Sequence, residues 1–590
     1  MKRPMGAALR VVLGIAISAV CLIARNYKVL VQQNVPVRMR DGVILRADIY
    51  RPDASGKFPV LLERTPYNKA TEVETGYQDA THGYVVIIQD CRGRYASDGE
   101  WYPFKHEPDD GYDTVEWAAA LPYSDGKVGM FGGSYVGATQ MLAAITHPPH
   151  LAGIFPMVTA SNYHSNWTYQ GGALTQWFDE SWTSGLAQNT LDRVVSQNTD
   201  AMAYAKALPL SRYSLFPLPA ASGSAGLQAL APYFLDWIHH PSYDAYWKQW
   251  SIEADYSRIR VPAFHTGGWY DLFLGGTLRN YMGIKAHGGT AAARNGQRLL
   301  IIVGGHAGLG RKVGDVDFGT SSVVDMNALM LRWYDWLLKG VHNGMGREKP
   351  VRYFEMGKDV WQEADSWPPP GERPTNFYLH SGGRANTARG DGTLSTAKPG
   401  NERPDSFVYN PANPVPTIGG KLCCDSVHLE PGARDQSPNE ARRDVLVYST
   451  PPFTHDFSVT GPVRLVLYAS SSAVDTDFTA TLVDVDPSGF ARNLTDGIIR
   501  ARYRNSMETP QFMTPKETYK FAIDLWATSN DFLAGHRLRL EVSSSNFPRF
   551  DRNLNTRESP ELGGHWVKAT NTVYHDAAHP SALVLPVLPR

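Results

Sequence analysis

The chain has 590 residues, a net charge of −1 and 43% hydrophobic residues, values typical of a large globular protein of two or three domains. The near-neutral charge provides no basic footprint for nucleic acid, so we expect no nucleic-acid partner. Only four cysteines occur, so no disulfide framework is predicted, and no Cys/His spacing typical of zinc is present.

The N-terminus is basic and then apolar. Lys2, Arg3 and Arg10 accompany an uncharged apolar run at 11–24. This order is typical of a secretory signal, and the run is shorter than the roughly 20 residues that a membrane-spanning helix needs. We predict a signal peptide over 1–24 and a secreted or periplasmic location. An uncleaved N-terminal anchor, which would be the chain's one membrane contact, is the alternative.

Apolar runs separated by polar loops and helical segments occupy two stretches of the chain. The runs that we assign to strands lie at 29–51, 59–62, 84–88, 154–158, 261–265 and 299–303. Helices are expected at 110–121 and 326–338. Continuous apolar strands that alternate with helices predict a mainly parallel sheet covered on both faces. The predicted sheet domain therefore comprises 29–160 and 258–350.

Two further regions have a different composition. Residues 161–257 are rich in Trp, Tyr, Gln and Ala, with helical stretches near 189–207 and 242–251, and we predict a helical cap over the sheet edge. From 374 to 590, short alternating runs are separated by Gly, Pro and Asp turns. This pattern is typical of an antiparallel β-sandwich or jelly roll.

Residues 127–137 have the order strand, sharp turn, serine, helix. An apolar run ends in Gly132 and Gly133, Ser134 follows, and a helix-compatible segment comes next. A serine on such a turn needs neighbours without a Cβ, because side chains would collide with the strand or the helix. This order predicts a nucleophile elbow. Gly137 lies three residues after the serine instead of two, and a glycine-rich turn with an incidental serine is the alternative.

A serine nucleophile needs a base and a third group that orients the base. In an α/β-hydrolase the acid and then the histidine follow the serine, on loops at the C-terminal ends of strands. Asp271 ends the loop after one predicted strand, and His306 follows two glycines after the next. We therefore predict that Ser134, Asp271 and His306 are catalytic. His265 is a competing base, but it precedes the acid and lies within or beside its strand.

Several motifs resemble a known family and extend over nearly the whole chain after the N-terminal run. They are Arg64-Thr-Pro-Tyr67, Gln89-Asp-Cys-Arg-Gly-Arg94, Asp109-Asp-Gly-Tyr-Asp-Thr-Val-Glu-Trp117, Gly132-Gly-Ser-Tyr-Val-Gly137, Gly268-Trp-Tyr-Asp271, Gly304-Gly-His306, Thr460-Gly-Pro-Val463 and Asp475-Thr-Asp477. With them the chain resembles serine hydrolases related to cocaine esterase, α-amino-acid ester hydrolases and X-Pro dipeptidyl-peptidases. The resemblance implies an α/β-hydrolase core with a helical cap and a C-terminal β jelly-roll domain.

The resemblance also implies a role for each site residue. Ser134 would be the nucleophile, His306 the general base and acid, and Asp271 its orienter. The Tyr67 hydroxyl and the backbone N–H of Tyr135 would form the oxyanion hole, whose donors often make the largest single contribution to catalysis. Without the family pattern, a loop tyrosine that packs against the cap would be the favoured interpretation of Tyr67.

Two observations bear on the substrate. Trp167, Trp269 and Phe273 are predicted to line an acyl pocket, because pocket walls are commonly aromatic; simple core positions are the alternative. Family members that act on α-amino acid esters carry a carboxylate cluster for the substrate ammonium, including an acid in the segment that matches 161–170. That segment contains no Asp or Glu here. A substrate with a free α-amino group is therefore not expected.

Cys423 and Cys424 are adjacent in the sequence. We expect two small buried thiols, which behave as small hydrophobic side chains. Oxidation to a vicinal disulfide in an exported protein is the alternative.

The predicted function is an exported serine hydrolase that cleaves small-molecule esters or amides through an acyl-enzyme, without a metal or organic cofactor. An X-Pro dipeptidyl-peptidase and a β-lactam acylase or α-amino-acid ester hydrolase are the alternatives within enzymes. A secreted binding protein on an idle hydrolase core is the alternative of another class. The intact set of serine, acid and histidine disfavours it. A homo-oligomer is left open.

Overall fold

The computed structural model describes residues 26–197, 228, 230–306, 310–560 and 562–589. The predicted signal at 1–24 and part of the predicted cap helix at 189–207 lie outside these residues. Within the described ranges, no helix combines the length and apolar character that a membrane crossing requires. The same residues contain no group of three or more His, Cys, Asp or Glu side chains arranged to hold a metal ion.

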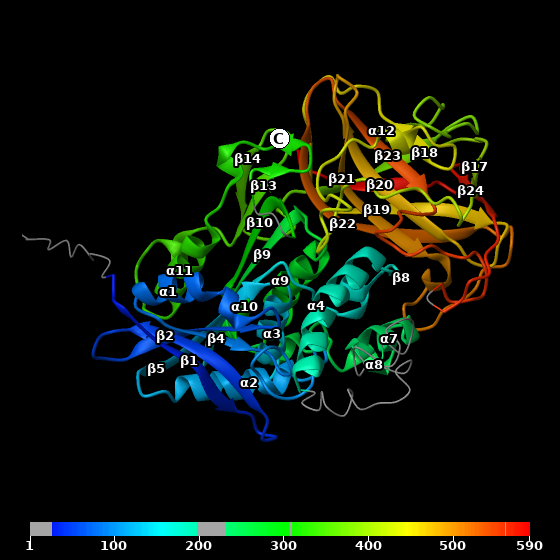
Figure 1. Cartoon of the computed structure of the whole chain (residues 1–590). Coiled ribbons are helices and arrows are strands. Elements are labelled where there is room, and N and C mark those ends of the chain that lie inside the picture. Colours follow the sequence, from blue (N-terminus) through cyan, green and yellow to red (C-terminus); the bar gives the residue numbers. More distant parts are fainter. Residues whose placement is uncertain (1–25, 198–227, 229, 307–309, 561, 590) are drawn as a thin grey trace, which may run out of the picture.

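One large sheet organises the first part of the chain (Figure 1). In the described residues it has ten strands in the order β1-β2-β4-β3-β5-β6-β9-β10-β13-β14. They are β1 (Val29–Arg38), β2 (Ile44–Pro52), β3 (Phe58–Thr65), β4 (Val85–Asp90), β5 (Ser124–Gly133), β6 (Leu151–Met157), β9 (Ala263–Tyr270), β10 (Gln297–Gly305), β13 (Val351–Glu355) and β14 (Val360–Ala364). In this order, every neighbouring pair from β4 to β13 is parallel. The pairs β1 with β2, β2 with β4 and β13 with β14 are antiparallel.

The predicted mainly parallel sheet is therefore confirmed, with one difference in extent. The sheet continues to Ala364, beyond the predicted end of its domain at residue 350. The cause is a hairpin at the edge: β13 pairs in parallel with β10, and β14 folds back on β13. The interior strand β4 is buried along its whole length, as expected of a strand covered on both faces.

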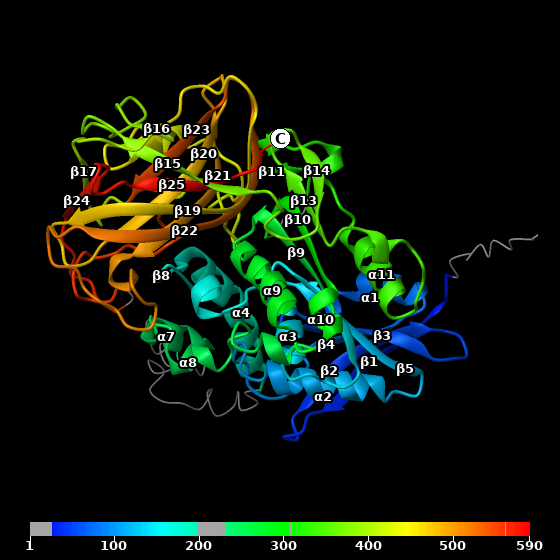
Figure 2. The ribbon, with the colours of Figure 1, turned by 180° about the vertical axis from the view of Figure 1, so that it is seen from behind.

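Helices cover both faces of the sheet (Figures 1 and 2). On one face Leu61 and Val86 share a buried cluster with Trp333 of α11, and on the other α2, α3 and α9 pack against strand side chains. The helices are α1 (Val73–Thr81), α2 (Glu107–Ala119), α3 (Tyr135–Ala144), α9 (Leu274–His287), α10 (Ala291–Asn295) and α11 (Met326–Leu337). The helices predicted at 110–121 and 326–338 thus correspond to α2 and α11.

The cap follows β6 and lies between the sheet and the C-terminal domain, as both ribbon views show for α4 (Figures 1 and 2). Its described elements are a π-helical turn (His164–Thr168), β7 (Tyr169–Gln170), β8 (Ala173–Leu174), α4 (Gln176–Gln197), α7 (Pro232–His239) and α8 (Ala245–Lys248). Five tryptophans that are at most 4% exposed form its core: Trp167, Trp182, Trp237, Trp247 and Trp250. The helix predicted at 242–251 is shorter than expected.

The C-terminal part is an all-β domain, as predicted (Figure 2). Its strands are β15 (Arg373–His380), β16 (Thr393–Ser395), β17 (Asp405–Tyr409), β18 (Leu446–Ser449), β19 (Phe457–Ser471), β20 (Asp477–Val485), β21 (Ala491–Arg500), β22 (Tyr519–Phe532), β23 (Arg537–Ser543), β24 (Ala569–Tyr574) and β25 (Ala582–Val587). All of these pair antiparallel except β16 with β18.

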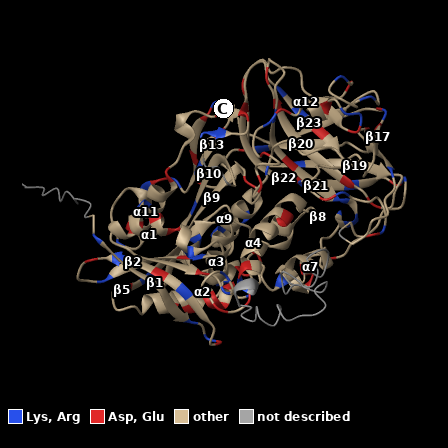
Figure 3. Cartoon of the chain, in the orientation of Figure 1, with Lys and Arg blue, Asp and Glu red and all other residues tan. Residues whose placement is uncertain are grey.

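This β domain packs directly on the sheet domain. The Tyr270 hydroxyl, at the end of β9, donates to the carbonyl of Asn493 at 2.8 Å. Trp269 belongs to the same buried cluster as Leu525 and Trp526 of β22. The C-terminal ends of the parallel strands, where an α/β sheet carries its chemistry, are therefore enclosed by the cap and by the β domain together. Charged side chains are mixed in sign over both domains (Figure 3).

Candidate active site

Ser134 lies on the sharp turn between β5, which ends at Gly133, and α3, which begins at Tyr135. Its backbone φ is 60°, in the left-handed region that residues other than glycine seldom adopt. Such strain is typical of a nucleophile elbow, which presents the serine hydroxyl above the sheet. The local pattern at 127–137 thus folds as predicted.

The glycines around the serine are not equivalent. Gly132 has φ of 121°, and a Cβ there would lie 2.2 Å from Cγ1 of Val136. At Gly137 a Cβ would meet Cβ of Thr159 at 2.8 Å, whereas at Gly133 the nearest atom would be at an ordinary 3.4 Å. The turn therefore requires a glycine at 132, as predicted, but not at 133.

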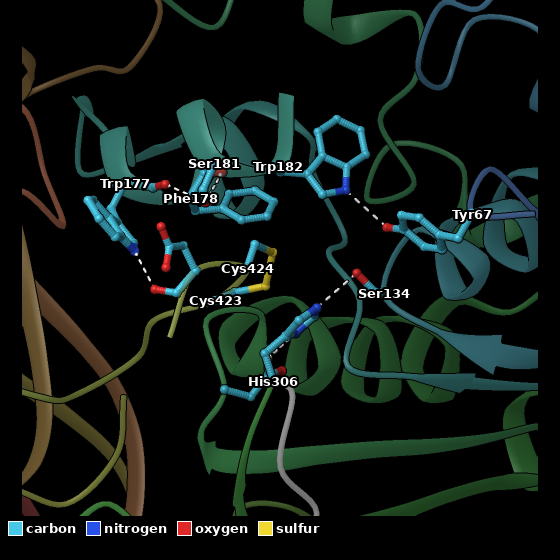
Figure 4. The surroundings of a disulfide bond; sticks show 11 residues. Tyr67, Ser134, Trp177, Phe178, Ser181, Trp182, His306, Cys423 and Cys424 are labelled. Atoms are coloured by element: carbon cyan, nitrogen blue, oxygen red, sulfur yellow. Dashed lines mark hydrogen bonds and ion pairs between the residues drawn. A yellow bond between two sulfur atoms is a disulfide. The ribbon is translucent and has the colours of Figure 1, made fainter. Parts of the chain in front are cut away.

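The structure brings the three predicted catalytic side chains together, and Figure 4 shows two of them, Ser134 and His306. The Ser134 hydroxyl lies 2.8 Å from Nε2 of His306, and Nδ1 of His306 lies 2.7 Å from Oδ1 of Asp271. Because a carboxylate only accepts, Nδ1–H donates to Asp271, and Nε2 is left to accept the serine proton. Asp271 is fully buried and follows β9, and His306 follows β10. This is the geometry of a serine nucleophile with an oriented general base.

His265, the competing base, has a different environment. It lies inside β9, is 1% exposed, and its Nε2 is 2.8 Å from Oε1 of Gln297. Burial lowers the pKa of His265 to about 4, so its imidazole is neutral at pH 7. It is a core residue of the sheet.

The two predicted oxyanion-hole donors lie beside the serine. The Tyr67 hydroxyl accepts a hydrogen bond from Nε1 of Trp182 at 3.0 Å and faces Ser134 (Figure 4). Burial raises the pKa of Tyr67, and its bonds to Trp182 and Ser134 offset this only in part. The phenol therefore keeps its proton at neutral pH. Tyr135 is the first residue of α3, where a backbone N–H has no partner inside the helix.

A buried network of charged and polar side chains contacts Tyr135, the residue that follows the serine. The Tyr135 hydroxyl donates to Oε1 of Glu107 at 3.0 Å and accepts from the backbone N–H of Phe104 at 2.8 Å. Arg64, fully buried, bonds to Glu107 at 2.5 Å and to Gln89 at 2.8 Å. No sequence motif pointed to Glu107. The only signal available was its position two residues before the Asp109–Trp117 motif.

The three predicted pocket aromatics separate into two groups. The Trp167 ring stacks on Phe273 at 4.4 Å, and Phe273 meets His306 edge-on at 5.1 Å. Both are at most 1% exposed, so they form the buried support of the histidine. Trp269 instead faces the interdomain core, where its Nε1 donates to the carbonyl of Phe354 at 2.6 Å. The prediction that Trp269 lines the pocket is therefore wrong.

The segment 161–170 acquires a carboxylate from elsewhere in the chain. Oε1 of Glu253 accepts from the Ser161 hydroxyl at 2.6 Å. Nη1 of Arg279 lies 3.4 Å from the same oxygen, so this carboxylate already has a cationic partner. The residues that follow Asp271 directly are Leu-Phe-Leu, all apolar.

The expectation of two buried thiols at 423 and 424 is wrong. Cys423 and Cys424 form a disulfide, and while Cys423 is 6% exposed, Cys424 reaches the surface. Cys424 adopts a backbone φ of 77°, and its segment lies against α4. Nε1 of Trp177 on α4 donates to the carbonyl of Asp425 at 3.3 Å (Figure 4).

Comparison with known proteins agrees with this architecture. Two family models match: X-Pro dipeptidyl-peptidase (S15 family) over residues 41–308, and the X-Pro dipeptidyl-peptidase C-terminal non-catalytic domain over 343–584. The first span holds most of the sheet and the cap, and the second holds the β domain. Cocaine esterase of Rhodococcus sp. (strain MB1 Bresler) is 39% identical over 585 residues, which cover 96% of this chain and 99% of that protein.

Solved structures share the whole fold. An α-amino acid ester hydrolase matches with a TM-score of 0.78 and 24% identity, over 99% of this chain and 98% of the other. An aminopeptidase from the marine sediment archaeon Thaumarchaeota archaeon matches with a TM-score of 0.78 and 23% identity, over 96% and 97%. At these identities the likeness shows the fold alone. The identity to cocaine esterase over nearly the full length goes further: the chain belongs to the cocaine esterase-like (CocE/NonD-type) family of serine hydrolases, which carries the S15 and X-Pro dipeptidyl-peptidase C-terminal domains.

Proposed function

We propose that this protein is an exported serine esterase that forms an acyl-enzyme on Ser134. The observation that carries the proposal is the hydrogen-bonded series from Ser134 through His306 to Asp271, at 2.8 and 2.7 Å. A serine hydroxyl at ordinary pKa is a poor nucleophile, and this series supplies the base that activates it.

The proposed reaction runs in two halves. The Ser134 oxygen attacks the substrate carbonyl as His306 Nε2 takes its proton, and Asp271 stabilises the imidazolium. The Tyr67 hydroxyl and the Tyr135 N–H donate to the oxyanion of the tetrahedral intermediate. His306 then protonates the leaving alcohol, and the acyl-enzyme forms. A water molecule then attacks the acyl-enzyme with His306 as its general base, and the carboxylic acid is released.

We propose an ester with an apolar group and no free α-ammonium as the substrate class. The name of the Rhodococcus relative, cocaine esterase, supports ester cleavage. The aromatic support of His306 and the pairing of Glu253 with Arg279 favour an uncharged group near the nucleophile. The family models for X-Pro dipeptidyl-peptidases keep peptide cleavage as the competing activity.

A fluorophosphonate probe and a substrate panel test the proposal. The full chain and its Ser134→Ala variant are compared on p-nitrophenyl acyl esters, a phenylglycine methyl ester and an Ala-Pro anilide. We expect labelling and ester turnover that the variant lacks, with little turnover of the two amino substrates. An unlabelled wild type would favour a binding protein on an idle core. Fast cleavage of the Ala-Pro anilide would instead favour the dipeptidyl-peptidase.

Export is proposed from the basic and apolar N-terminus and from the Cys423–Cys424 disulfide, because disulfides persist in oxidising compartments. Fractionation of expressing cells and N-terminal sequencing test it. We expect a soluble exported product that has lost about 24 residues. An intact N-terminus in the membrane fraction would support the uncleaved anchor, and an intact cytoplasmic product would contradict both.

A further inference from the structure

The Cys423–Cys424 disulfide lies at the candidate active site. Its surroundings include Ser134, His306 and Tyr67, although the disulfide belongs to the β domain (Figure 4). In that view the disulfide and Tyr67 lie on opposite sides of Ser134. A covalent feature of the C-terminal domain thus borders the space above the nucleophile.

The disulfide is held firmly in this place. Cys423 belongs to the buried cluster that contains Trp167, Phe178 and Phe273, and Phe273 contacts the catalytic histidine. Phe178 meets Phe273 edge-on at 5.4 Å. On the other side of the turn, the Trp177 indole bonds to the carbonyl after Cys424. Cys423 is therefore part of the same buried core as the aromatic support of the site.

The other side of the disulfide is open. Cys424 is exposed, and its backbone φ of 77° lies in the left-handed region that residues other than glycine seldom adopt. A disulfide between adjacent residues closes an eight-membered ring, which restricts the backbone of the turn to few conformations. The open side of the disulfide is consequently that of Cys424, which the ring holds in a defined position.

We infer that the Cys423–Cys424 disulfide is a wall of the substrate site that selects esters with a bulky apolar or aromatic group. A disulfide has no proton to donate, is polarisable, and makes favourable contacts with aromatic rings. This inference rests on the proposed function, because it names the substrate group that the same site accepts. The β domain would then determine specificity as well as support the core.

Reduction should remove the wall. Two electrons and two protons convert the disulfide to two thiols, and a phosphine that supplies the electrons becomes its oxide with oxygen from water. The ring opens, the turn regains rotational freedom, and two S–H groups replace the apolar surface. Small esters, which do not reach the wall, should be affected little.

The first test compares the wild type with the Cys423→Ser/Cys424→Ser double variant. Alkylation and mass spectrometry establish that the two cysteines are alkylated only after reduction. kcat/KM is then measured for p-nitrophenyl acetate, for esters with longer or aromatic acyl groups, and for acetate esters of bulky alcohols. We expect the preference for the bulky member of at least one series to fall about 10-fold, with acetate nearly unchanged.

Reversible reduction of the wild type by a water-soluble phosphine provides the matched measurement, in case the variant folds poorly. The same selectivity should be lost on reduction and regained on reoxidation, and the double variant should not respond to the phosphine. Equal loss on every ester would indicate a purely structural disulfide, and unchanged selectivity would mean that no substrate group touches it. Either result overturns the inference.

A binding measurement separates this inference from the proposed function. Ser134→Ala protein, which cannot turn over substrate, is titrated calorimetrically with p-nitrophenyl benzoate and p-nitrophenyl acetate in both redox states. Tighter binding of the benzoate that is lost on reduction supports the wall even if the wild type proves inactive. Absence of benzoate binding, or binding that reduction leaves unchanged, contradicts it.

Discussion

The indole N–H of Trp182 donates to the hydroxyl oxygen of Tyr67 at 3.0 Å, and this bond joins the cap to the candidate oxyanion hole. A phenol that accepts one bond keeps its single proton free to donate. In Figure 4 the Tyr67 hydroxyl oxygen, held by Trp182, lies on the side of the ring where Ser134 is found. The cap thus orients a donor that belongs to the sheet domain.

The Trp182→Phe variant tests this orientation. The phenylalanine keeps most of the ring packing and loses the donor, so we expect kcat to fall by about 3- to 10-fold, the value of one neutral hydrogen bond, with less change in KM. Tyr67→Phe should lose about 100-fold or more, because it removes the oxyanion donor itself. In the Tyr67→Phe background, Trp182→Phe should add little. If the losses in kcat of the two single variants multiply in the double variant, Trp182 does not act through Tyr67.

Asp271→Asn should lower kcat by about 10⁴-fold with little loss of stability. The asparagine amide can donate to His306 Nδ1, so the imidazole proton moves to Nε2. A protonated Nε2 cannot accept the proton of Ser134. Steady-state kinetics and a thermal melt measure both effects. Retention of a tenth or more of the activity would indicate that another group orients the histidine.

The glycines before the serine offer a matched pair. Gly132→Ala combines φ of 121° with a 2.2 Å approach to Val136, so we expect a loss of about 3 kcal/mol of unfolding free energy or failure to fold. Gly133→Ala makes only ordinary contacts and should cost less than about 1 kcal/mol. Urea unfolding of both variants measures the difference. Equal costs would contradict the geometry of the elbow.

Folding stability should depend on the buried histidines below neutral pH. Burial lowers the pKa values of His164 and His265 to about 4, against about 6.5 in an unfolded chain. Between these values the unfolded state binds more protons than the folded state. The contribution of each histidine is therefore complete above pH 6.5 and is lost as the pH falls toward 4, at about 1.4 kcal/mol per pH unit.

Urea unfolding between pH 7.5 and pH 4.5 checks this prediction. His265→Gln removes one titrating group and preserves a polar partner for Gln297. The unfolding free energy of the variant should therefore change less steeply with pH than that of the wild type, by the equivalent of about one bound proton. Identical slopes would mean that His265 is protonated in the folded state.

Much of the architecture follows from local pattern. The apolar runs at 84–88 and 299–303 predicted buried parallel strands because a strand covered on both faces is apolar along its length. The elbow was predictable because a serine in the left-handed region needs particular neighbours. The order of Ser134, Asp271 and His306 after successive strands is likewise a property of the linear chain.

Other features depended on where the chain turns after a strand ends and on which strands pair. Trp269 and Phe273 are four residues apart, yet Trp269 packs in the interdomain core and Phe273 against His306. Trp269 lies in β9, whereas Phe273 follows the strand's end at Tyr270 and precedes α9, so the chain turns between them and strand alternation does not predict where the Phe273 ring packs. The edge hairpin that extends the sheet to Ala364 is also decided by pairing with β10.

By itself the sequence predicted the fold class, the elbow and the three residues Ser134, Asp271 and His306 that the structure brings together, since each depends on residues close together in the chain or on their order along it. Only the tertiary structure decided which long-range contacts complete the site. Trp182 reaches Tyr67 across 115 positions, and the Cys423–Cys424 disulfide joins the surroundings of Ser134 from another domain. Such contacts depend on how the cap and the β domain pack on the sheet, and no local periodicity encodes that packing.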